Sequence, residues 1–358
     1  MAKRKKKSVY SGIGGQAVLE GIMMKNKEEY AVAVRLPDGK IEVMRQECKG
    51  VFGDSVVKKI PFVRGVFNFI ESLVLGMQTL TYSASFYEEE EQETVSDKMM
   101  KKVFKDKAEN VIMGFTVFVS IILAIGLFMI LPYVISEFLA KYIQNNSVIA
   151  IIEGVTRILI FLLYVVLISL MKDIRRVYQY HGAEHKCINC IESGRPLTVR
   201  NVMRCSRLHR RCGTSFMLIV MIISVILFFF IRVEAVWLKL LLRLLLIPVI
   251  AGISYEVLRI AGKFDNLFVR IISAPGLWLQ RLTTREPEEE MVEVAIAAIE
   301  KVFDWEAFEE KHFKRRMVKK TKTLEDGQVV ETGDETMEID VLELEERLKA
   351  HNAEDGNE

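Results

Sequence analysis

Histidine and cysteine are scarce in this chain of 358 residues, which contains five of each. Three of the histidines and four of the cysteines lie between His181 and Cys212. Imidazole and thiolate groups are typical ligands of zinc and related metals. Because such ligands are nearly absent elsewhere, the sequence predicts its chemistry within this one segment.

Net charge and phosphate-binding motifs are also lacking. The formal net charge is only +2, which argues against a nucleic-acid-binding role. The glycine-dense residues 12–21 have neither the GxGxxG nor the GxxxxGK[ST] spacing of a phosphate-binding loop. The basic residues 3–7 are too far from any apolar run to form a signal peptide.

Charged residues are missing altogether from three apolar segments, residues 111–131, 158–171 and 214–231. In a fourth, residues 236–258, the charged residues lie toward the two ends. With their flanks, all four approach the roughly 20 residues that a helix needs to cross about 30 Å of hydrocarbon. They lack the polar face of a helix on a globular surface, so a buried soluble core is the less favoured alternative. The sequence therefore predicts a mainly α membrane protein with about four transmembrane helices.

Lysine and arginine concentrate between the second and third apolar segments, where ten of them lie in residues 172–211. The loops on the opposite side, residues 141–146 and 232–234, are short and nearly neutral. Cytoplasmic loops of membrane proteins are enriched in these two residues. The pattern predicts that both termini and the His/Cys segment are cytoplasmic, where thiols stay reduced.

Residues 1–108 are expected to form a cytoplasmic α+β region. Alternating apolar and polar residues on either side of Pro37-Asp38-Gly39 predict a β-hairpin over residues 30–44. Residues 60–87 predict an amphipathic helix that lies on the membrane or against the helix bundle, with a re-entrant segment as the alternative. Residues 88–93 read as an acidic linker.

The remainder of the chain is predicted as three consecutive parts. Residues 109–258 form the four-helix transmembrane domain, with its His/Cys loop at residues 172–214. Residues 259–303 form interfacial and cytoplasmic helices, the last capped by Thr283 or Thr284. Residues 304–358 form a charged, mobile tail with at most a weak hairpin at 322–331 and a helix at 341–350.

His181 and His185 are four residues apart in the segment that follows the second span. On a helix continuing from that span they lie one above the other and can share a metal. With Glu184 they complete H-x-x-E-H, the pattern of inverted zinc proteases. In that class the glutamate is the general base toward a water on the metal.

His209 and Cys212 add two candidate ligands from the same loop. Glu256, at the cytoplasmic end of the fourth span in this topology, could supply a carboxylate ligand or base. A catalytic zinc keeps three protein ligands and an open position, whereas a structural zinc has four. The sequence allows both, and Cys212 as a nucleophile is a further alternative.

Five separate stretches carry a resemblance to a known family: GGQAVLEGIMM at 14–24, YHGAEHKCINC at 180–190, HRRCGTSF at 209–216, GISYEVLR at 252–259 and PGLWLQRLTTREP at 275–287. Together they resemble the YqhQ family of bacterial multi-pass membrane proteins, which are labelled predicted metal-dependent enzymes. The resemblance covers residues 9–303 and implies a location in a bacterial cell membrane. It also implies roles for the family's polar positions, here His181, Glu184, His185, His209, Cys212 and Glu256.

Two functions from different classes follow. The first is a zinc-dependent hydrolase at the cytoplasmic face, with Glu184 or Glu256 as the base. The second is a non-catalytic scaffold, or an assembly or insertion factor, in which the metal is structural. The lipid bilayer is a partner in both, and the second adds other membrane proteins or the protein-insertion machinery. A transporter is less favoured because the spans offer few ionisable groups for a pathway.

Overall fold

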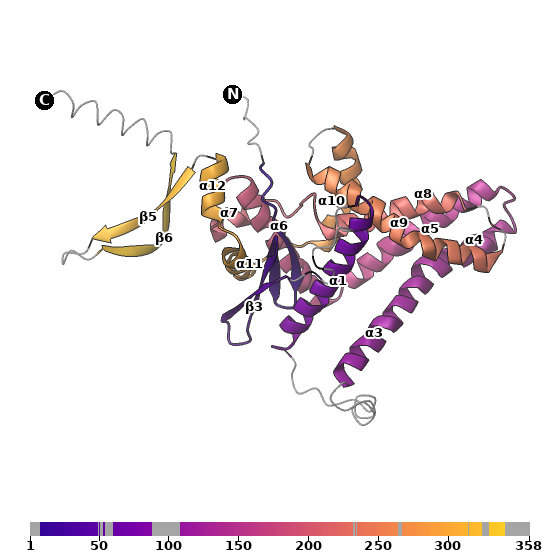
Figure 1. The fold of residues 1–358 in the computed structure, drawn as a ribbon, viewed down its shortest axis with the longest axis horizontal. Coiled ribbons are helices and arrows are strands. Elements are labelled where there is room, and N and C mark those ends of the chain that lie inside the picture. Colours follow the sequence, from indigo (N-terminus) through magenta and orange to yellow (C-terminus); the bar gives the residue numbers. More distant parts are fainter. Residues whose placement is uncertain are drawn as a thin grey trace. The chain divides into compact units, whose positions relative to one another are not determined.

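The computed structural model describes residues 8–48, 60–87, 108–231, 235–263, 267–313, 315–323 and 329–340, with residues 50, 53 and 233 (Figure 1). The chain divides into two compact units. The first consists of Met1–Lys49, Arg176–His209 and Thr284–Glu358, and the second of Gly50–Arg175 and Arg210–Thr283. Each unit is therefore assembled from segments that are far apart in the sequence.

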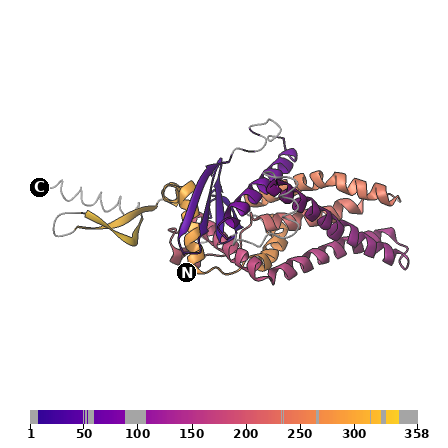
Figure 2. The same ribbon diagram turned by 90° about the horizontal axis from the view of Figure 1, so that it is seen from below.

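The first unit contains a four-stranded antiparallel sheet of β1 (Gly14–Val18), β2 (Gly21–Asn26), β3 (Glu29–Arg35) and β4 (Ile41–Glu47), in that order. Figure 2 shows the strands of this sheet side by side. The hairpin expected at residues 30–44 is confirmed as β3 and β4. The interior of β3 is buried on both faces, and α11 (Glu289–Val302) packs against β2 and β3.

The apolar face of α11 makes this packing possible. Its residues Val292, Ala295 and Ile299 follow the i, i+3, i+7 spacing of one helix face and are 0% exposed. The helix was expected to begin at Thr283 or Thr284, and this is wrong, because it begins at Glu289 after an extended Glu288. The backbone before this helix instead bonds to another helix, since the N–H of Arg285 donates to the carbonyl of Tyr178 at 2.8 Å.

The remaining elements of the first unit are α6 (Lys172–Glu192, whose first turn lies in the second unit), α7 (Val199–Met203), α12 (Trp305–Phe313) and the hairpin of β5 (Arg315–Thr323) and β6 (Val329–Asp340). The hairpin expected at 322–331 is confirmed, with longer strands. Buried Trp305 joins α12 to the core of the unit. The linker at 88–93 and the helix expected at 341–350 lie outside the described residues.

The second unit is helical in its described residues. It contains α1 (Val63–Ala84), α3 (Ala108–Ile125), the π-helical turn η3 (Gly126–Ile130), α4 (Leu131–Ala140), α5 (Asn146–Ser169), α8 (Gly213–Phe229), α9 (Val236–Lys263) and α10 (Leu267–Thr283). α5 packs against α4 and α8, α8 against α9 and α10, and α1 against α9. The helix expected at residues 60–87 is thus confirmed as α1.

Among the described residues, three helical segments are long and apolar enough to cross a membrane: Gly114–Ala140, Asn146–Ser169 and Val236–Ala261. Outward residues of α5 such as Ile151, Val155 and Leu159 are more than half exposed, as expected of a lipid-facing stripe. The other expected span is α8, which has 17 residues and a length of about 26 Å. The chain is therefore a mainly helical protein with apolar helices suited to a membrane and a small antiparallel sheet.

Candidate metal centre

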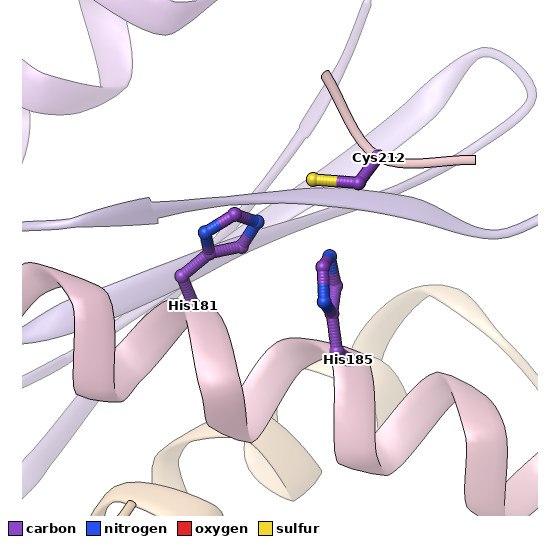
Figure 3. Close-up of side chains that lie close together, drawn as sticks. All are labelled: His181, His185 and Cys212. Atoms are coloured by element: carbon purple, nitrogen blue, oxygen red, sulfur yellow. The ribbon is translucent and has the colours of Figure 1, made fainter. Parts of the chain in front are cut away.

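His181 and His185 lie on successive turns of α6, with ring centroids 4.3 Å apart (Figure 3). This helix was expected to continue from the second span, which is wrong, because α5 ends at Ser169 and a tight turn at Leu170 and Met171 separates the two helices. The four-residue spacing still places both rings on one face of α6.

The imidazole of His185 is oriented by the backbone. Its Nδ1 lies 2.7 Å from the carbonyl oxygen of Arg207. Because a carbonyl can only accept, Nδ1 is the donor, and in the neutral ring Nε2 keeps its lone pair. Metal-binding histidines typically donate their other N–H to a carbonyl in this way. His185 is therefore held in a tautomer that can bind a metal.

Two further side chains of α6 hold the loop between α7 and α8 by its carbonyl groups. Lys186 donates from Nζ to the carbonyl oxygens of residues 203 and 205, at 2.8 and 2.9 Å. Asn189 donates from Nδ2 to those of residues 206 and 208, at 2.6 and 3.1 Å. Together with His185, these contacts fix the backbone immediately before His209.

Cys212 follows three residues later and is the N-cap of α8, where its Sγ accepts from the N–H of Thr214 at 3.4 Å. The candidate ligand atoms of His181, His185 and Cys212 all lie within 4.8 Å of one another (Figure 3). Zinc-to-ligand distances of about 2.0–2.3 Å require ligand atoms roughly 3.3–3.8 Å apart. Side-chain shifts of about an ångström would fit these three residues around a zinc ion.

His209 is near this set but is not part of it. Its ring centroid lies 5.6 Å from that of His185, and its Nε2 lies 3.6 Å from Oε2 of Glu192. Glu192 is buried and also accepts from the N–H and hydroxyl of Ser11, at 3.1 and 3.0 Å. The structure therefore brings three of the four expected ligands together and gives His209 a carboxylate partner.

Sequence reasoning missed Glu192, although a signal was present. It lies eleven residues after His181 in the chain, and eleven residues make just over three full turns of an α-helix. A carboxylate at this spacing is expected on the same face of α6 as the two histidines.

Glu184 is 4% exposed and points toward β1. A Cβ placed on Gly15 would lie 2.9 Å from the carboxyl carbon of Glu184. The absence of a side chain at Gly15 is therefore what allows β1 to approach α6 at this position. The glycine-dense stretch near the N-terminus serves this close approach.

Glu256, the other expected carboxylate, lies in α9 and is engaged by an arginine. Nε and Nη2 of Arg64 donate to its two oxygens, each at 2.6 Å. The guanidinium of Arg259 is 3.6 Å away. This bidentate geometry is the strong form of an arginine–carboxylate pair, and it ties α1 to α9.

The cysteines of the segment differ in their chemistry. Burial raises the pKa of the Cys187 thiol. Cys190 donates a hydrogen bond to Cys205, which raises its own pKa. This hydrogen bond and the positive charge of the Arg195 guanidinium together lower the pKa of Cys205 to about 7. Cys205 is thus the thiol of this group that is most readily ionised.

The fold and the candidate centre define a class: a mainly helical protein with membrane-suited helices and a His/Cys cluster. The model of a family described as "Protein of unknown function (DUF1385)" matches residues 60–305. The curated "Uncharacterized protein YqhQ" of Bacillus subtilis (strain 168) is 36% identical over 315 residues, which are 88% of this chain and 98% of that protein. The chain belongs to this family, as its five sequence motifs indicated. No solved structure matches it.

Proposed function

We propose that this chain is an integral protein of the bacterial cell membrane with a cytoplasm-facing zinc site, and that it acts as a metal-dependent hydrolase. The observation that carries the proposal is the convergence of His181, His185 and Cys212 within 4.8 Å. A zinc ion bound there would supply Lewis acidity toward a carbonyl or phosphoryl oxygen.

Three protein ligands favour the catalytic reading over the structural one. A structural zinc is closed by four ligands, whereas a catalytic zinc leaves a position open. His209, the fourth candidate, is near Glu192 and is not part of the three-residue set. If the metal is catalytic, the pair of His209 and Glu192, which lies near His185, would hold a proton for the reaction.

Glu184 is the better candidate for the general base. It precedes His185 directly on α6 and is buried in the same unit. Glu256 has both oxygens engaged by Arg64, so a structural role for it is the simpler assignment. The hydrolytic step would transfer a proton from the attacking water to Glu184 and then to the leaving group.

The topology we propose has four crossings with both termini in the cytoplasm. α8 is about 26 Å long, and the three residues after Phe229 include the apolar Phe230 and Ile231. A slightly short hydrophobic helix is accommodated by local thinning of the bilayer at modest cost. The ten basic residues between 172 and 211 then lie in the cytoplasm.

The first test is metal analysis of the purified full-length protein. We expect about one zinc per chain in the wild type, and a loss of about 10-fold or more of zinc affinity in His185→Ala and Cys212→Ala. His312→Ala is the matched control, because His312 is exposed on α12. Wild-type protein that binds no zinc, iron or manganese would refute the site.

The second test separates the hydrolase from the scaffold with a structural metal. Glu184→Gln keeps the volume of the side chain and removes its basicity. In the hydrolase it should abolish function in cells while zinc content and stability persist. Full function of Glu184→Gln would favour the scaffold, and His185→Ala would then act through stability alone.

A further inference from the structure

The second unit buries three charges among its apolar helices. Glu153 and Arg157 lie one turn apart in α5, and Arg243 lies in α9, with 7%, 3% and 3% of each residue exposed. Glu153 accepts from Nη2 of Arg157 and from Nη2 of Arg243, both at 2.8 Å. One carboxylate therefore faces two guanidinium groups. Charges inside membrane-spanning segments are costly and typically mark functional sites.

Arg157 obtains a second partner from an irregular helical turn. Its Nε donates to the carbonyl of Phe128 in η3 at 3.0 Å. In an α-helix that carbonyl would accept from the N–H of residue 132, but residue 132 is a proline and has none. The carbonyl satisfies a donor of Arg157 without cancelling its charge.

Aromatic faces cover both guanidinium groups. The ring of Phe228 has its centroid 4.7 Å from Cζ of Arg157 and 5.3 Å from Cζ of Arg243. The ring of Tyr133 lies 5.6 Å from Arg243. These cation–π contacts are stabilising, yet the rings are neutral. The three buried groups still carry one positive charge in excess.

A small cavity adjoins this excess charge. The charged residues line it together with Ala150, Gly154 and Val225, and it has room for about one water-sized group. Nε of Arg243 is buried and, within the described part of the chain, has no hydrogen-bond partner. A buried N–H without an acceptor is unfavourable, so the cavity suits an incoming oxygen that bears negative charge.

The depth of the cavity indicates where this oxygen comes from. Glu153 and Arg243 each follow the first residue of their helix by seven positions, or about 10 Å. α5 has 24 residues, about 36 Å, against about 30 Å of hydrocarbon. If the helix extends about 3 Å beyond the hydrocarbon at each end, the cavity lies about 7 Å inside the hydrocarbon, on the head-group side of the bilayer midplane.

We propose that Arg157 and Arg243 form a binding site for a phosphate oxyanion: the head-group phosphate of an anionic phospholipid, or free phosphate. Glu153 offsets only one of the two positive charges. One phosphate oxygen enters the cavity and accepts from Nε of Arg243. This site is independent of the metal centre.

Thermal unfolding of the purified full-length protein tests the proposal. Phosphatidylglycerol, phosphatidylcholine and inorganic phosphate are added separately. We expect phosphatidylglycerol to raise Tm by about 5 °C or more relative to phosphatidylcholine. An equal rise with inorganic phosphate would assign the site to the free anion. If neither anion exceeds phosphatidylcholine, the proposal is overturned.

Variants connect the response to the named residues. Arg243→Gln should lose the shift, but it also removes a buried ion pair with Glu153, so Glu153→Gln is the decisive change. Of the three buried charged groups, Glu153 is the only negative one, and this change removes its charge. The side chain keeps its size and an oxygen that can accept hydrogen bonds. The phosphatidylglycerol concentration for half of the shift should fall about 10-fold, as expected for the loss of one nearby like charge. A purely structural ion network predicts an unchanged or weaker response, which would overturn the proposal.

Lys239→Gln is the matched control. Lys239 lies in the same helix as Arg243 and 5.2 Å from the ring of Tyr133, but it does not line the cavity. Its response to phosphatidylglycerol should stay within about 2-fold of the wild type, because a more distant and more exposed charge is better screened. A loss as large as that of Arg243→Gln would show a general surface attraction to anions and overturn the assignment.

Discussion

The two units differ in how they satisfy the buried polar groups beside their candidate sites. In the first, His185, Lys186 and Asn189 donate to backbone carbonyls, which carry no net charge. In the second, Arg157 and Arg243 share one carboxylate and rest on aromatic rings. The first arrangement leaves the Nε2 lone pair of His185 for a cation. The second leaves the Nε donor of Arg243 for an anion, so the two proposed sites would take ligands of opposite charge.

The largest expected effect concerns the packing of the first unit. A Cβ on Gly182 of α6 would overlap the carbonyl oxygen of Arg285. Gly182→Ala should therefore lower the free energy of unfolding by about 3 kcal/mol, measured by thermal or denaturant unfolding in detergent. Gly114→Ala is the control, because no atom lies within 4 Å of its added Cβ. It should change stability by no more than about 1 kcal/mol.

The next effect tests whether the carbonyl contacts hold the metal ligands. Lys186→Met removes two charge-assisted hydrogen bonds to the loop and should cost about 2–3 kcal/mol of stability. Zinc affinity should also fall, because this loop leads to Cys212 and positions it as a ligand. Lys172→Met, an exposed lysine at the start of the same helix, should leave both unchanged. Normal zinc binding in Lys186→Met would show that the loop is positioned by other contacts.

A smaller effect is expected at Glu256. Glu256→Gln weakens the bidentate pair with Arg64. The side chain of Glu256 is 14% exposed and that of Arg64 is 19% exposed, so the change should lower the free energy of unfolding by about 1 kcal/mol. Arg64→Gln should cost a similar amount, and the double variant little more, since both changes break one interaction. Zinc content should not change. A loss of zinc in Glu256→Gln would instead place this carboxylate at the metal centre.

The smallest effect is a change of reactivity with pH. Because the pKa of Cys205 is lowered to about 7, its thiolate persists down to that pH and is lost below it. Maleimide labelling of Cys205 should rise about 10-fold from pH 6 to pH 8, as read by mass spectrometry. Cys187, whose pKa burial raises, should remain unlabelled. Arg195→Gln should move the midpoint for Cys205 upward.

The contrast between the units also explains which parts the sequence could predict. The candidate metal ligands fall within one segment of 32 residues, 181–212, so their concentration is visible without a fold. The hairpin of β3 and β4 and the helix α1 were predictable for the same reason, since their signals are local. Glu153, Arg157 and Arg243 come from two helices, and each is an isolated charge in an apolar run. Only packing brings them together.

Local signals failed where tertiary contacts replaced local ones. Thr283, Thr284 and Pro287 have the residue types of a helix start. The helix begins later because Arg285 bonds to the backbone of α6 instead. The break between α5 and α6 was missed because Leu170 and Met171 have no residue type that ends a helix. Pro132 gave a visible signal, but its consequence at Arg157 depends on how α5 packs.

Pro132 and Arg157 are linked because proline has no backbone N–H to donate. The missing N–H leaves the Phe128 carbonyl available, and Arg157 uses it. An alanine at 132 would let the helix reclaim this carbonyl and leave the arginine short of an acceptor. Selection should therefore act on the two positions jointly. We expect related sequences without proline at 132 to have lost the arginine at 157 as well, a correlated replacement that an alignment of the family can check.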